Sequence, residues 1–489
     1  MTDLLTHPLW QRSDLGKPLP DSPHAVSVSM PCWDHVVGYE EHDPAVTDRL
    51  WCGYPRFVMH PYVKRLFARC AERFAGPGET AVAFPSWTVA ERCVAYLRER
   101  RGFPARLESF GHHGVTAVII PEEAYEGARH FWMHFGEVVS SRHALAALEE
   151  TPAAEDGAAA KEAVRGRLAD LSGVSAKDVF LYPSGMAALS DALRVARAEA
   201  PGLKTVQLGF PYVDVLKVQR AVGPGAHFVE PPGNLEGLEH LLRRETVAAV
   251  VCEFPGNPLL QSPDLPRLSY CLRKRGIPLI IDDTTSTCIN TNLWPHADAV
   301  MTSLTKHFSG AGDVMAGALI LNDDSPFYAS HGKRLRNQYE DLLFADDAVA
   351  LELNSRDFAD RMRRVNATTM ALCDALAEHP GVARVYYPKF ETTDHYTRAL
   401  RPGGGYGGLF SLLLEDAPTR AARFYDRLRL CKGPTLGNRF SMACPYTLLA
   451  HYDDLGWVES AGVSRWLVRV SVGLEEVDDL RERFEEALG

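Results

Sequence analysis

Val300-Met-Thr-Ser-Leu-Thr-Lys306-His-Phe-Ser-Gly310-Ala-Gly-Asp313 is the stretch that decides how this chain is interpreted. It places one lysine after an apolar segment, between hydroxyl side chains and a glycine-rich turn. A second apolar segment, Ile277–Ile281, lies upstream and ends in Asp282-Asp283. Both segments are typical of buried strands; Asp282 follows one directly, and Lys306 comes a few residues after the other.

A lysine that forms a Schiff base and an aspartate that pairs with a pyridine nitrogen are what pyridoxal phosphate (PLP) requires of a protein. Lys306 and Asp282 therefore predict a PLP enzyme that acts on an amino acid. A carboxylate at the end of a buried strand is costly unless it is paired, and a protonated ring nitrogen is such a partner. Asp283 is expected to face polar loop groups instead. A single lysine is more often a solvated surface charge, but this one follows a buried strand.

Length and composition narrow the class of protein. The 489 residues predict two or three domains, and the net charge of −11 argues against a nucleic-acid or anionic-membrane partner. We expect no transmembrane helix, because no apolar run approaches ~18 residues. We also expect no signal peptide, because the N-terminus lacks a basic flank and an apolar core. Ten scattered cysteines without a CxxC pair suit reduced thiols in the cytoplasm and no metal site.

Strands and helices alternate from Lys177 onward, which predicts an α/β fold with a mainly parallel sheet covered on both faces. A capped helix is expected from Ser86 to Arg101, a strand at 115–120 and a long helical stretch at about 347–378. Residues 152–160 and those after Leu321 are expected to be connections. The predicted sheet strands are 179–182, 205–208, 247–252, 279–281 and 299–301. The predicted domains are an N-terminal extension (1–130), a large cofactor-binding domain (131–335) and a C-terminal domain with its linking helix (336–489).

Further motifs fit the same cofactor. Ser184-Gly185-Met186 opens a helix directly after a strand, and a helix N-terminus suits a phosphate. Tyr212 follows the next strand, where an aromatic ring can stack on a pyridine. Asn257 ends the following strand and can hold the phenolate oxygen of the cofactor. Each has a plainer explanation: a helix cap, a packing tyrosine and a turn asparagine before proline.

Hydroxyl side chains and an arginine complete the candidate set. Ser303 and Thr305 precede Lys306 and can add phosphate contacts. Arg469 lies in an alternating strand, and an arginine fork can hold a carboxylate through two parallel bonds. Alternation by itself favours an arginine that points outward from a half-exposed strand.

The order of these motifs resembles the Cys/Met-metabolism family of PLP-dependent enzymes, from about residue 175 to the C-terminus. The matching segments are Ser-Gly-Met-Ala-Ala, Asn-Pro-Leu-Leu, Ile-Asp-Asp-Thr, Ser-Leu-Thr-Lys-His-Phe-Ser-Gly and Leu-Val-Arg-Val-Ser-Val-Gly. The segments 22–31, 37–41 and 53–57 resemble the extended N-terminus of fungal-type cystathionine γ-synthases.

The resemblance implies fold type I, with a seven-stranded sheet, a smaller C-terminal α/β domain and a homodimer or homotetramer. It implies that Lys306 carries the cofactor and Asp282 pairs with its ring nitrogen, while Tyr212 stacks on the ring and helps to deprotonate the substrate amine. The phosphate would be held by Gly185, Met186, Ser303 and Thr305. The substrate-binding residues would be Asn257, Thr435 and Arg469, with Thr435 standing where the family usually has serine.

Two departures from the family pattern are visible. The segment before Ser184 lacks the usual Tyr-x-Arg-x-x-Asn-Pro-Thr motif, which reaches the phosphate of the neighbouring subunit. Tyr54-Pro-Arg56 has the Tyr-x-Arg pattern but lies far upstream. The usual Asp-Asn-Thr is Asp282-Asp283-Thr284 here.

The implied reaction is γ-replacement on an O-acylhomoserine, most simply with L-cysteine to give cystathionine. Three alternatives stay open: a γ- or β-lyase on cystathionine-like or methionine-like amino acids, γ-replacement with another nucleophile in a specialised pathway, and an inactive PLP-fold regulator. The motifs do not distinguish a synthase from a lyase. Retention of both Lys306 and Asp282 counts against the inactive protein.

Overall fold

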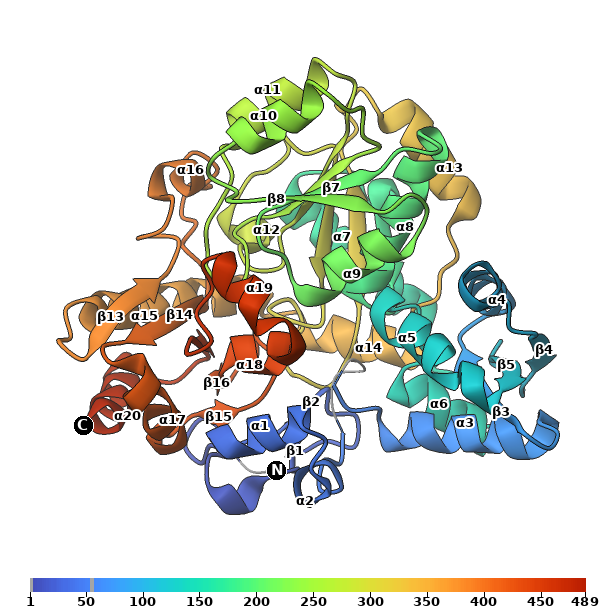
Figure 1. The fold of residues 1–489 in the computed structure, drawn as a ribbon, viewed down its shortest axis with the longest axis horizontal. Coiled ribbons are helices and arrows are strands. Elements are labelled where there is room, and N and C mark those ends of the chain that lie inside the picture. Colours follow the sequence, from blue (N-terminus) through green and yellow to red (C-terminus); the bar gives the residue numbers. More distant parts are fainter. Residues whose placement is uncertain (1–2, 53–56) are drawn as a thin grey trace.

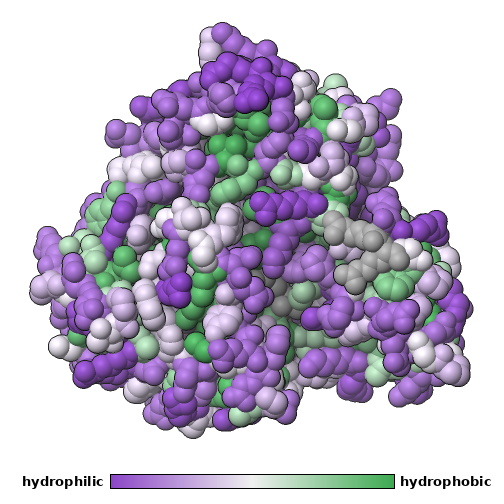
Figure 2. Space-filling view, in the orientation of Figure 1, coloured by the Kyte–Doolittle hydropathy of each residue, from purple (hydrophilic) through white to green (hydrophobic). Residues whose placement is uncertain are grey.

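The structure is a computed structural model that describes residues 3–52 and 57–489. Figure 1 shows a large central α/β unit, a smaller unit from the C-terminal part of the chain, and N-terminal segments that contact both. Among the described helices, none is long and apolar enough to cross a membrane. The face drawn in Figure 2 is mostly hydrophilic.

A seven-stranded sheet forms the central unit. In spatial order its strands are β6 (Val179–Tyr182), β12 (Gly317–Leu321), β11 (Ala299–Ser303), β10 (Leu279–Asp282), β9 (Val250–Glu253), β7 (Thr205–Leu208) and β8 (Ala226–Val229). The five strands from β11 to β8 are parallel, and β12 runs antiparallel to both of its neighbours. The predicted mainly parallel sheet is confirmed. Strand β9 begins three residues later than expected, and β8 and β12 were not predicted.

Helices cover both faces of this sheet, because its central strands are apolar on both sides. They are α7 (Gly157–Ser172), α8 (Gly185–Glu199), α9 (Val213–Ala221), α10 (Glu236–Leu242), α11 (Leu265–Arg273), α12 (Thr287–Asn290) and α13 (Tyr328–Gln338). Two predicted connections are wrong in part: α7 begins within 152–160, and α13 occupies the stretch after Leu321.

The C-terminal unit is built on a five-stranded sheet. Its strands, in spatial order, are β13 (Val382–Tyr386), β14 (Leu409–Leu414), β17 (Val468–Ser471), β16 (Met442–Cys444) and β15 (Cys431–Lys432). Its helices are α15 (Phe358–Ala377), α16 (Thr393–Thr397), α17 (Ala417–Arg427), α18 (Tyr446–His451), α19 (Leu455–Ser460) and α20 (Val477–Leu488). Helix α14 (Ala345–Asn354) precedes them in the chain and packs against α7 of the central unit. The predicted helix at 347–378 is two helices, α14 and α15, separated at residues 355–357.

The N-terminal region carries two small sheets. The pair β1 (Pro18–Leu19) and β2 (Ser27–Val28) is antiparallel, and β3 (Glu79–Phe84), β5 (Thr116–Pro121) and β4 (Arg106–Ser109) form a three-stranded sheet. The helices are α1 (Trp33–Glu40), α2 (Pro44–Thr47), α3 (Pro61–Phe74), α4 (Trp87–Arg101), α5 (Tyr125–Phe135) and α6 (Ser141–Glu149). The predicted cap of α4 is confirmed, since the Ser86 side chain accepts from the Val89 N–H at 3.3 Å.

The N-terminal segment is tied to both other units by backbone hydrogen bonds. The N–H of Val26 donates to the carbonyl of Gly312 at 2.9 Å, six residues after Lys306 in the chain. The N–H of Met30 donates to the carbonyl of Lys432 in β15 at 3.0 Å. The domain boundaries at residues 130 and 335 stay predictions. All ten cysteines are free, and all except Cys288 are buried.

Candidate active site

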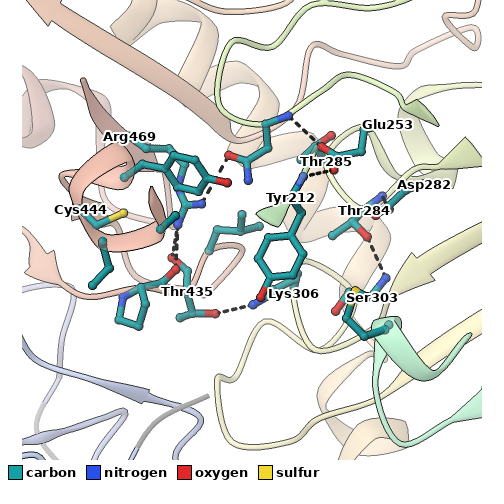
Figure 3. Close-up of a pocket in the computed structure, with 18 of the residues that line it drawn as sticks. Tyr212, Glu253, Asp282, Thr284, Thr285, Ser303, Lys306, Thr435, Cys444 and Arg469 are labelled. Carbon is teal, nitrogen blue, oxygen red and sulfur yellow. Dashed lines mark hydrogen bonds between the residues drawn. The ribbon is translucent and has the colours of Figure 1, made fainter. Parts of the chain in front are cut away.

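A cavity of about 850 Å³ lies between the large sheet and the C-terminal unit. Figure 3 shows Asp282 and Arg469 on opposite sides of the cavity, with Tyr212 and Lys306 between them. Every predicted site residue except Thr305 lines it: Gly185, Met186, Tyr212, Asn257, Asp282, Ser303, Lys306, Thr435 and Arg469.

The amine of Lys306 faces this cavity from the turn after β11. Its Nζ donates to Thr435 Oγ1 at 3.0 Å, a contact that joins the large sheet to the C-terminal unit. Burial lowers the pKa of Lys306 to about 7, and the nearby positive charge of Arg469 acts in the same direction. A lysine with such a pKa is largely an uncharged nucleophile in neutral to mildly alkaline solution.

Two carboxylates stand side by side where β9 and β10 end. Glu253 and Asp282 are register partners on these parallel strands. Burial raises the pKa of both groups, and the charge of Asp282 raises that of Glu253 further. Asp282 Oδ1 accepts from the Thr284 N–H at 2.8 Å. A cationic partner in the cavity would offset the free-energy cost of burying these two carboxylates side by side.

Glu253 was not predicted as a site residue, although it begins the segment that ends at Asn257. Its carboxylate accepts from the backbone N–H of Tyr212 and, at 2.9 Å, from that of Asn257. It therefore fixes the two loops that carry the predicted ring-stacking and oxygen-binding side chains. A buried glutamate at a strand end was the available signal for this residue.

The N-terminus of α8 and the end of β11 form a narrow cradle. Ser184 caps the helix by accepting from the Ala187 N–H at 3.1 Å, and first-turn N–H groups have no intrahelical partner. A Cβ on Gly185 would lie 2.9 Å from Ser303 Cβ, so glycine is required for this close approach. The buried Ser303 Oγ has no hydrogen-bond partner among the described residues. These features fit a phosphate group.

Thr305 and Asp283 lie outside this cavity. The hydroxyl of Thr305 bridges the backbone of Ala316: it donates to the carbonyl at 3.2 Å and accepts from the N–H at 3.0 Å. Asp283 was expected among polar loop groups but is buried, which raises its pKa to about 7. It lines a separate small cavity with Thr302 and His307.

Arg469 is buried in β17 and does not point outward, because both faces of that strand are covered. Its guanidinium donates to the carbonyl of Pro434 at 2.8 Å and to Asn257 Oδ1 at 3.4 Å, and it lies over the Tyr446 ring at 4.8 Å. The contact with Asn257 places a cation beside an amide side chain at the cavity wall. Such a pair is suited to a substrate carboxylate.

Comparison with known proteins decides the family. The model of the Cys/Met metabolism PLP-dependent enzymes matches residues 156–489, and that of the N-terminal domain of fungal trans-sulfuration enzymes matches residues 62–140. This chain belongs to the Cys/Met-metabolism family of PLP-dependent enzymes. Its cofactor is therefore PLP, and the predicted class, a transferase or carbon–sulfur lyase with fold type I, is confirmed.

Relatives in this family extend over nearly the whole chain. The cystathionine γ-synthase of Neurospora crassa is 32% identical and covers 97% of this chain and 98% of its own. The L-2-amino-4-chloropent-4-enoate dechlorinase/desaturase of Streptantibioticus cattleyicolor is 34% identical, with 96% and 97% covered. Among solved structures, a methionine γ-lyase of Micromonospora echinospora is 26% identical, with a TM-score of 0.57 over 66% of this chain and 84% of its own.

The N-terminal region of this family member supports the helix that begins after Tyr212. In α5, His134 Nδ1 lies 2.8 Å from Asp214 Oδ1, and both side chains are buried. Asp214 is in the first turn of α9, so the pair joins α5 to the start of that helix. The ring of His130, on the same helix, contacts the His134 ring in an edge-to-face arrangement, with 4.2 Å between the ring centroids.

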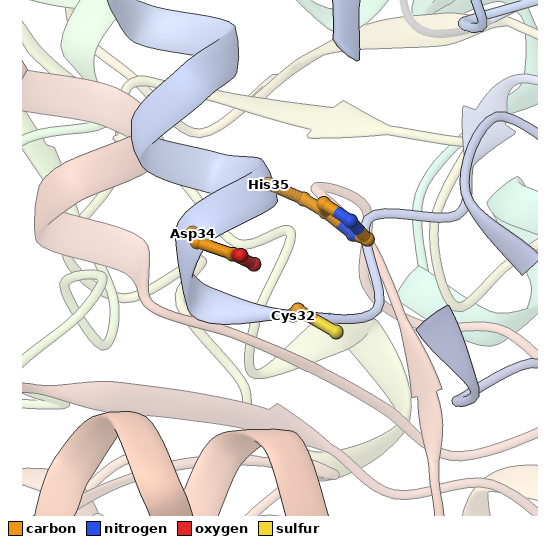
Figure 4. A group of neighbouring side chains, drawn as sticks. All are labelled: Cys32, Asp34 and His35. Atoms are coloured by element: carbon orange, nitrogen blue, oxygen red, sulfur yellow. The ribbon is translucent and has the colours of Figure 1, made fainter. Parts of the chain in front are cut away.

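A separate group of possible metal ligands lies at the start of α1: Cys32, Asp34 and His35 (Figure 4). Arg12 donates to Asp34 at 2.7 Å and lies 3.2 Å from His35 Nε2. A guanidinium already supplies positive charge to two of the three groups. We therefore assign this group a structural role. The Tyr54-Pro-Arg56 pattern lies outside the described residues.

Proposed function

We propose that this enzyme catalyses γ-replacement on an O-acylhomoserine, with a thiol as the entering group. L-Cysteine, which would give cystathionine, is the thiol predicted from the sequence. The observation that carries the proposal is the placement of the Lys306 amine in one cavity with the Asp282 carboxylate and the Arg469 guanidinium. Family membership and the relative named cystathionine γ-synthase support the same chemistry.

Each residue has a defined part in this proposal. When bound, PLP supplies the electron sink for cleavage of bonds at the substrate. Arg469 and Asn257 hold the substrate carboxylate, which orients Cα toward Lys306. The Lys306 amine takes the proton from Cα, and Thr435 Oγ1 holds that amine in place between steps. After passing on that proton, the same amine takes a proton from Cβ, and the acyloxy group leaves Cγ with the bonding electrons as a carboxylate. The thiol then adds through sulfur to Cγ and gives up its proton, and protons are returned to Cβ and Cα.

Other residues hold and orient the cofactor. Asp282 pairs with the ring nitrogen, and Tyr212 stacks on the ring and assists removal of the substrate amine proton. The phosphate is assigned to Gly185, Met186 and Ser303. Thr305 is retained as a phosphate ligand in the proposal, but its hydroxyl would first have to leave its contacts with Ala316.

Elimination without replacement is the second candidate. The relatives include a dechlorinase/desaturase and a methionine γ-lyase, so loss of a γ-substituent occurs within the family without a thiol entering. The same cavity residues would serve until the leaving group has departed. The molecule that next reaches the site then decides the outcome: either a thiol adds, or a keto acid and ammonia are released.

Mass spectrometry of the products tests both candidates. Purified enzyme with PLP would be incubated with O-acetyl- or O-succinyl-homoserine, with and without L-cysteine. Cystathionine that forms only with cysteine supports the proposal, whereas 2-oxobutanoate in all tubes supports elimination. The Lys306→Ala variant is the control for reaction by free PLP. We also propose that the enzyme is a homo-oligomer. Light scattering of the protein as it elutes from a size-exclusion column would distinguish a monomer, a dimer and a tetramer.

A further inference from the structure

We propose that Arg361 is a positioning residue for the reaction: it fixes the turn that follows Lys306, and through that turn the Lys306 amine. Arg361 lies near the start of α15 in the C-terminal unit and is not among the described residues that line the cavity. The inference rests on the role of Lys306 in the proposed function. It adds a residue that acts on Lys306 from outside the cavity.

The guanidinium of Arg361 binds the backbone of this turn at three successive carbonyls. Its Nη2 donates to the carbonyls of His307 at 3.0 Å, Phe308 at 3.0 Å and Ser309 at 3.3 Å. Its Nη1 donates to Asp357 Oδ1 at 3.1 Å. The side chain is only 3% exposed, so water cannot take over these bonds if they are lost. Burial lowers the pKa of Arg361 to about 10, and the group is therefore still charged at neutral pH.

The backbone of the turn has further contacts with the C-terminal unit. The N–H of Arg439 donates to the carbonyl of Gly310 at 2.8 Å, so the carbonyls of residues 307–310 are all bound from that unit. Gly437 packs against the peptide between Lys306 and His307, because a Cβ on Gly437 would lie 2.5 Å from the His307 nitrogen and 2.8 Å from the Lys306 carbonyl carbon. The backbone at Lys306 is therefore fixed by both packing and hydrogen bonds.

Gly310 leaves the space that the guanidinium of Arg361 occupies. Its φ is +68°, in the left-handed region that favours glycine. A Cβ on Gly310 would lie 2.7 Å from the guanidinium carbon of Arg361. The close approach of Arg361 to the turn therefore depends on a glycine in the segment that carries Lys306.

A fixed turn matters because the Lys306 side chain is long and flexible, so its amine has a defined position only if its backbone does. The amine lies 3.0 Å from Thr435 Oγ1. Without the Arg361 fork, three carbonyls of buried residues lose their donor, and the turn must move to satisfy them. A displacement of about 1 Å at a reacting group can cost about 100-fold in rate. A displaced amine is also better hydrated, which raises its pKa.

Arg361→Lys separates position from charge. The ammonium keeps the positive charge, but it lacks the planar fork that reaches three acceptors at once. The charged groups that face the Lys306 amine across the cavity, Arg469, Glu253 and Asp282, are unchanged by this substitution. A change at the amine therefore reports its position.

Two measurements on this variant test the inference. The rate of PLP loading would be followed across pH by the visible absorption of the cofactor, and kcat and KM would be measured with the donor that the wild type uses. The midpoint of loading should rise by at least about half a unit. The kcat should fall by about 10- to 100-fold, with KM unchanged within about twofold. Arg363→Lys is the matched control, because Arg363 is exposed on the same helix, and it should leave the midpoint and kcat at wild-type values.

Asn354→Ala keeps the test decisive if Arg361→Lys does not fold. Asn354 Nδ2 donates to Ser309 Oγ at 3.2 Å and to Asp313 Oδ1 at 2.9 Å, so its loss loosens the same turn and should shift the midpoint in the same direction by a smaller amount. An unchanged midpoint in folded Arg361→Lys, or in Asn354→Ala where Arg361→Lys does not fold, would overturn the inference even if urea unfolding shows lower stability. Wild-type cofactor absorption in Lys306→Ala would overturn the proposed function, and the inference with it.

Discussion

Glu253 and Asp282 end adjacent parallel strands as register partners, and their two carboxylates have different surroundings. Glu253 accepts two backbone N–H groups, from Tyr212 and Asn257, and so secures two loops. Asp282 accepts the backbone N–H of Thr284 and lines the cavity. One carboxylate organises the walls of the site, and its neighbour remains available to a cationic ring.

Replacement of Glu253 by Gln should lower the catalytic rate of the enzyme without abolishing the reaction. An amide cannot accept both N–H groups as the carboxylate does, and a buried unsatisfied group costs about 1–3 kcal/mol. We expect kcat to fall by roughly 5- to 100-fold, with the cofactor still bound. Asp282→Asn is the comparison and should mainly reduce PLP affinity and alter its absorption. Identical effects of the two variants would contradict this division of roles.

The depressed pKa of Lys306 should make the protein without cofactor less stable. The folded pKa of about 7 lies below the ordinary value of 10.5, so the unfolded state binds more protons between these values. The penalty is full below pH 7 and disappears as pH rises to 10.5. Lys306→Met should therefore raise the free energy of unfolding near pH 7 by up to about 5 kcal/mol, and the gain should vanish near pH 10.5. Urea unfolding of both proteins across this range would measure it.

Loading of PLP should accelerate as pH rises through about 7, because the uncharged Lys306 amine is the reactive form. Removal of the Arg469 charge in Arg469→Leu should move this midpoint upward. Stopped-flow measurement of the cofactor absorption would give both midpoints. Arg429→Leu, which removes a half-exposed arginine of the same unit, should leave the midpoint unchanged. A wild-type rate that is flat from about pH 6 to about pH 9, a range that includes this pKa, would contradict the assignment.

The cradle beside Ser303 predicts that Gly185→Ala loses affinity for PLP. The added Cβ would lie 2.9 Å from Ser303 Cβ and 3.1 Å from its Cα, so the phosphate position must shift. Gly166→Ala in α7 is a matched control, because nothing lies within 4 Å of its Cβ. That change should add up to about 1 kcal/mol of stability from helix propensity alone. Equal PLP affinity in both variants would argue against a phosphate at this cradle.

The His134–Asp214 pair predicts a role for the N-terminal region in catalysis. His134→Phe leaves a buried carboxylate without this partner and should cost about 1–3 kcal/mol of stability. It should also lower kcat, because Asp214 begins the helix that follows Tyr212. His134→Asn can still donate to Asp214 and should recover most of both losses. Loss of stability with an unchanged kcat would restrict the pair to folding.

The sequence was most informative where a charged or glycine residue interrupts an apolar run. Such interruptions located Asp282 at the end of β10 and Lys306 in the turn after β11, because a buried apolar segment needs a reason to lead into a charge. The edge strand β8 is half-buried and has no alternating pattern to distinguish it from a loop. Strand β12 follows a glycine-rich turn and pairs antiparallel, so βαβ alternation does not anticipate it.

The apolar part of the cavity lining could not be predicted in the same way. Tyr446, Leu449 and Ala450 lie in a short apolar segment that resembles any buried helix. They line the same cavity as Asp282 and Lys306, which lie more than 100 residues earlier in the chain, and only the folded structure brings these segments together. Strand alternation alone favoured an outward Arg469, because alternation carries no information about a second covering layer, whereas the resemblance placed Arg469 in the substrate site.

The hydrogen bond from Arg483 to the carbonyl of Leu5 joins positions 478 residues apart, and Met30 is likewise bonded to Lys432. During synthesis, the residues around Leu5 and Met30 therefore emerge well before the segments that complete their native contacts. The full set of contacts between the N-terminal segment and the C-terminal unit can therefore form only after α20 has been synthesised. Loss of either contact, Arg483 with Leu5 or Met30 with Lys432, should therefore loosen the active site.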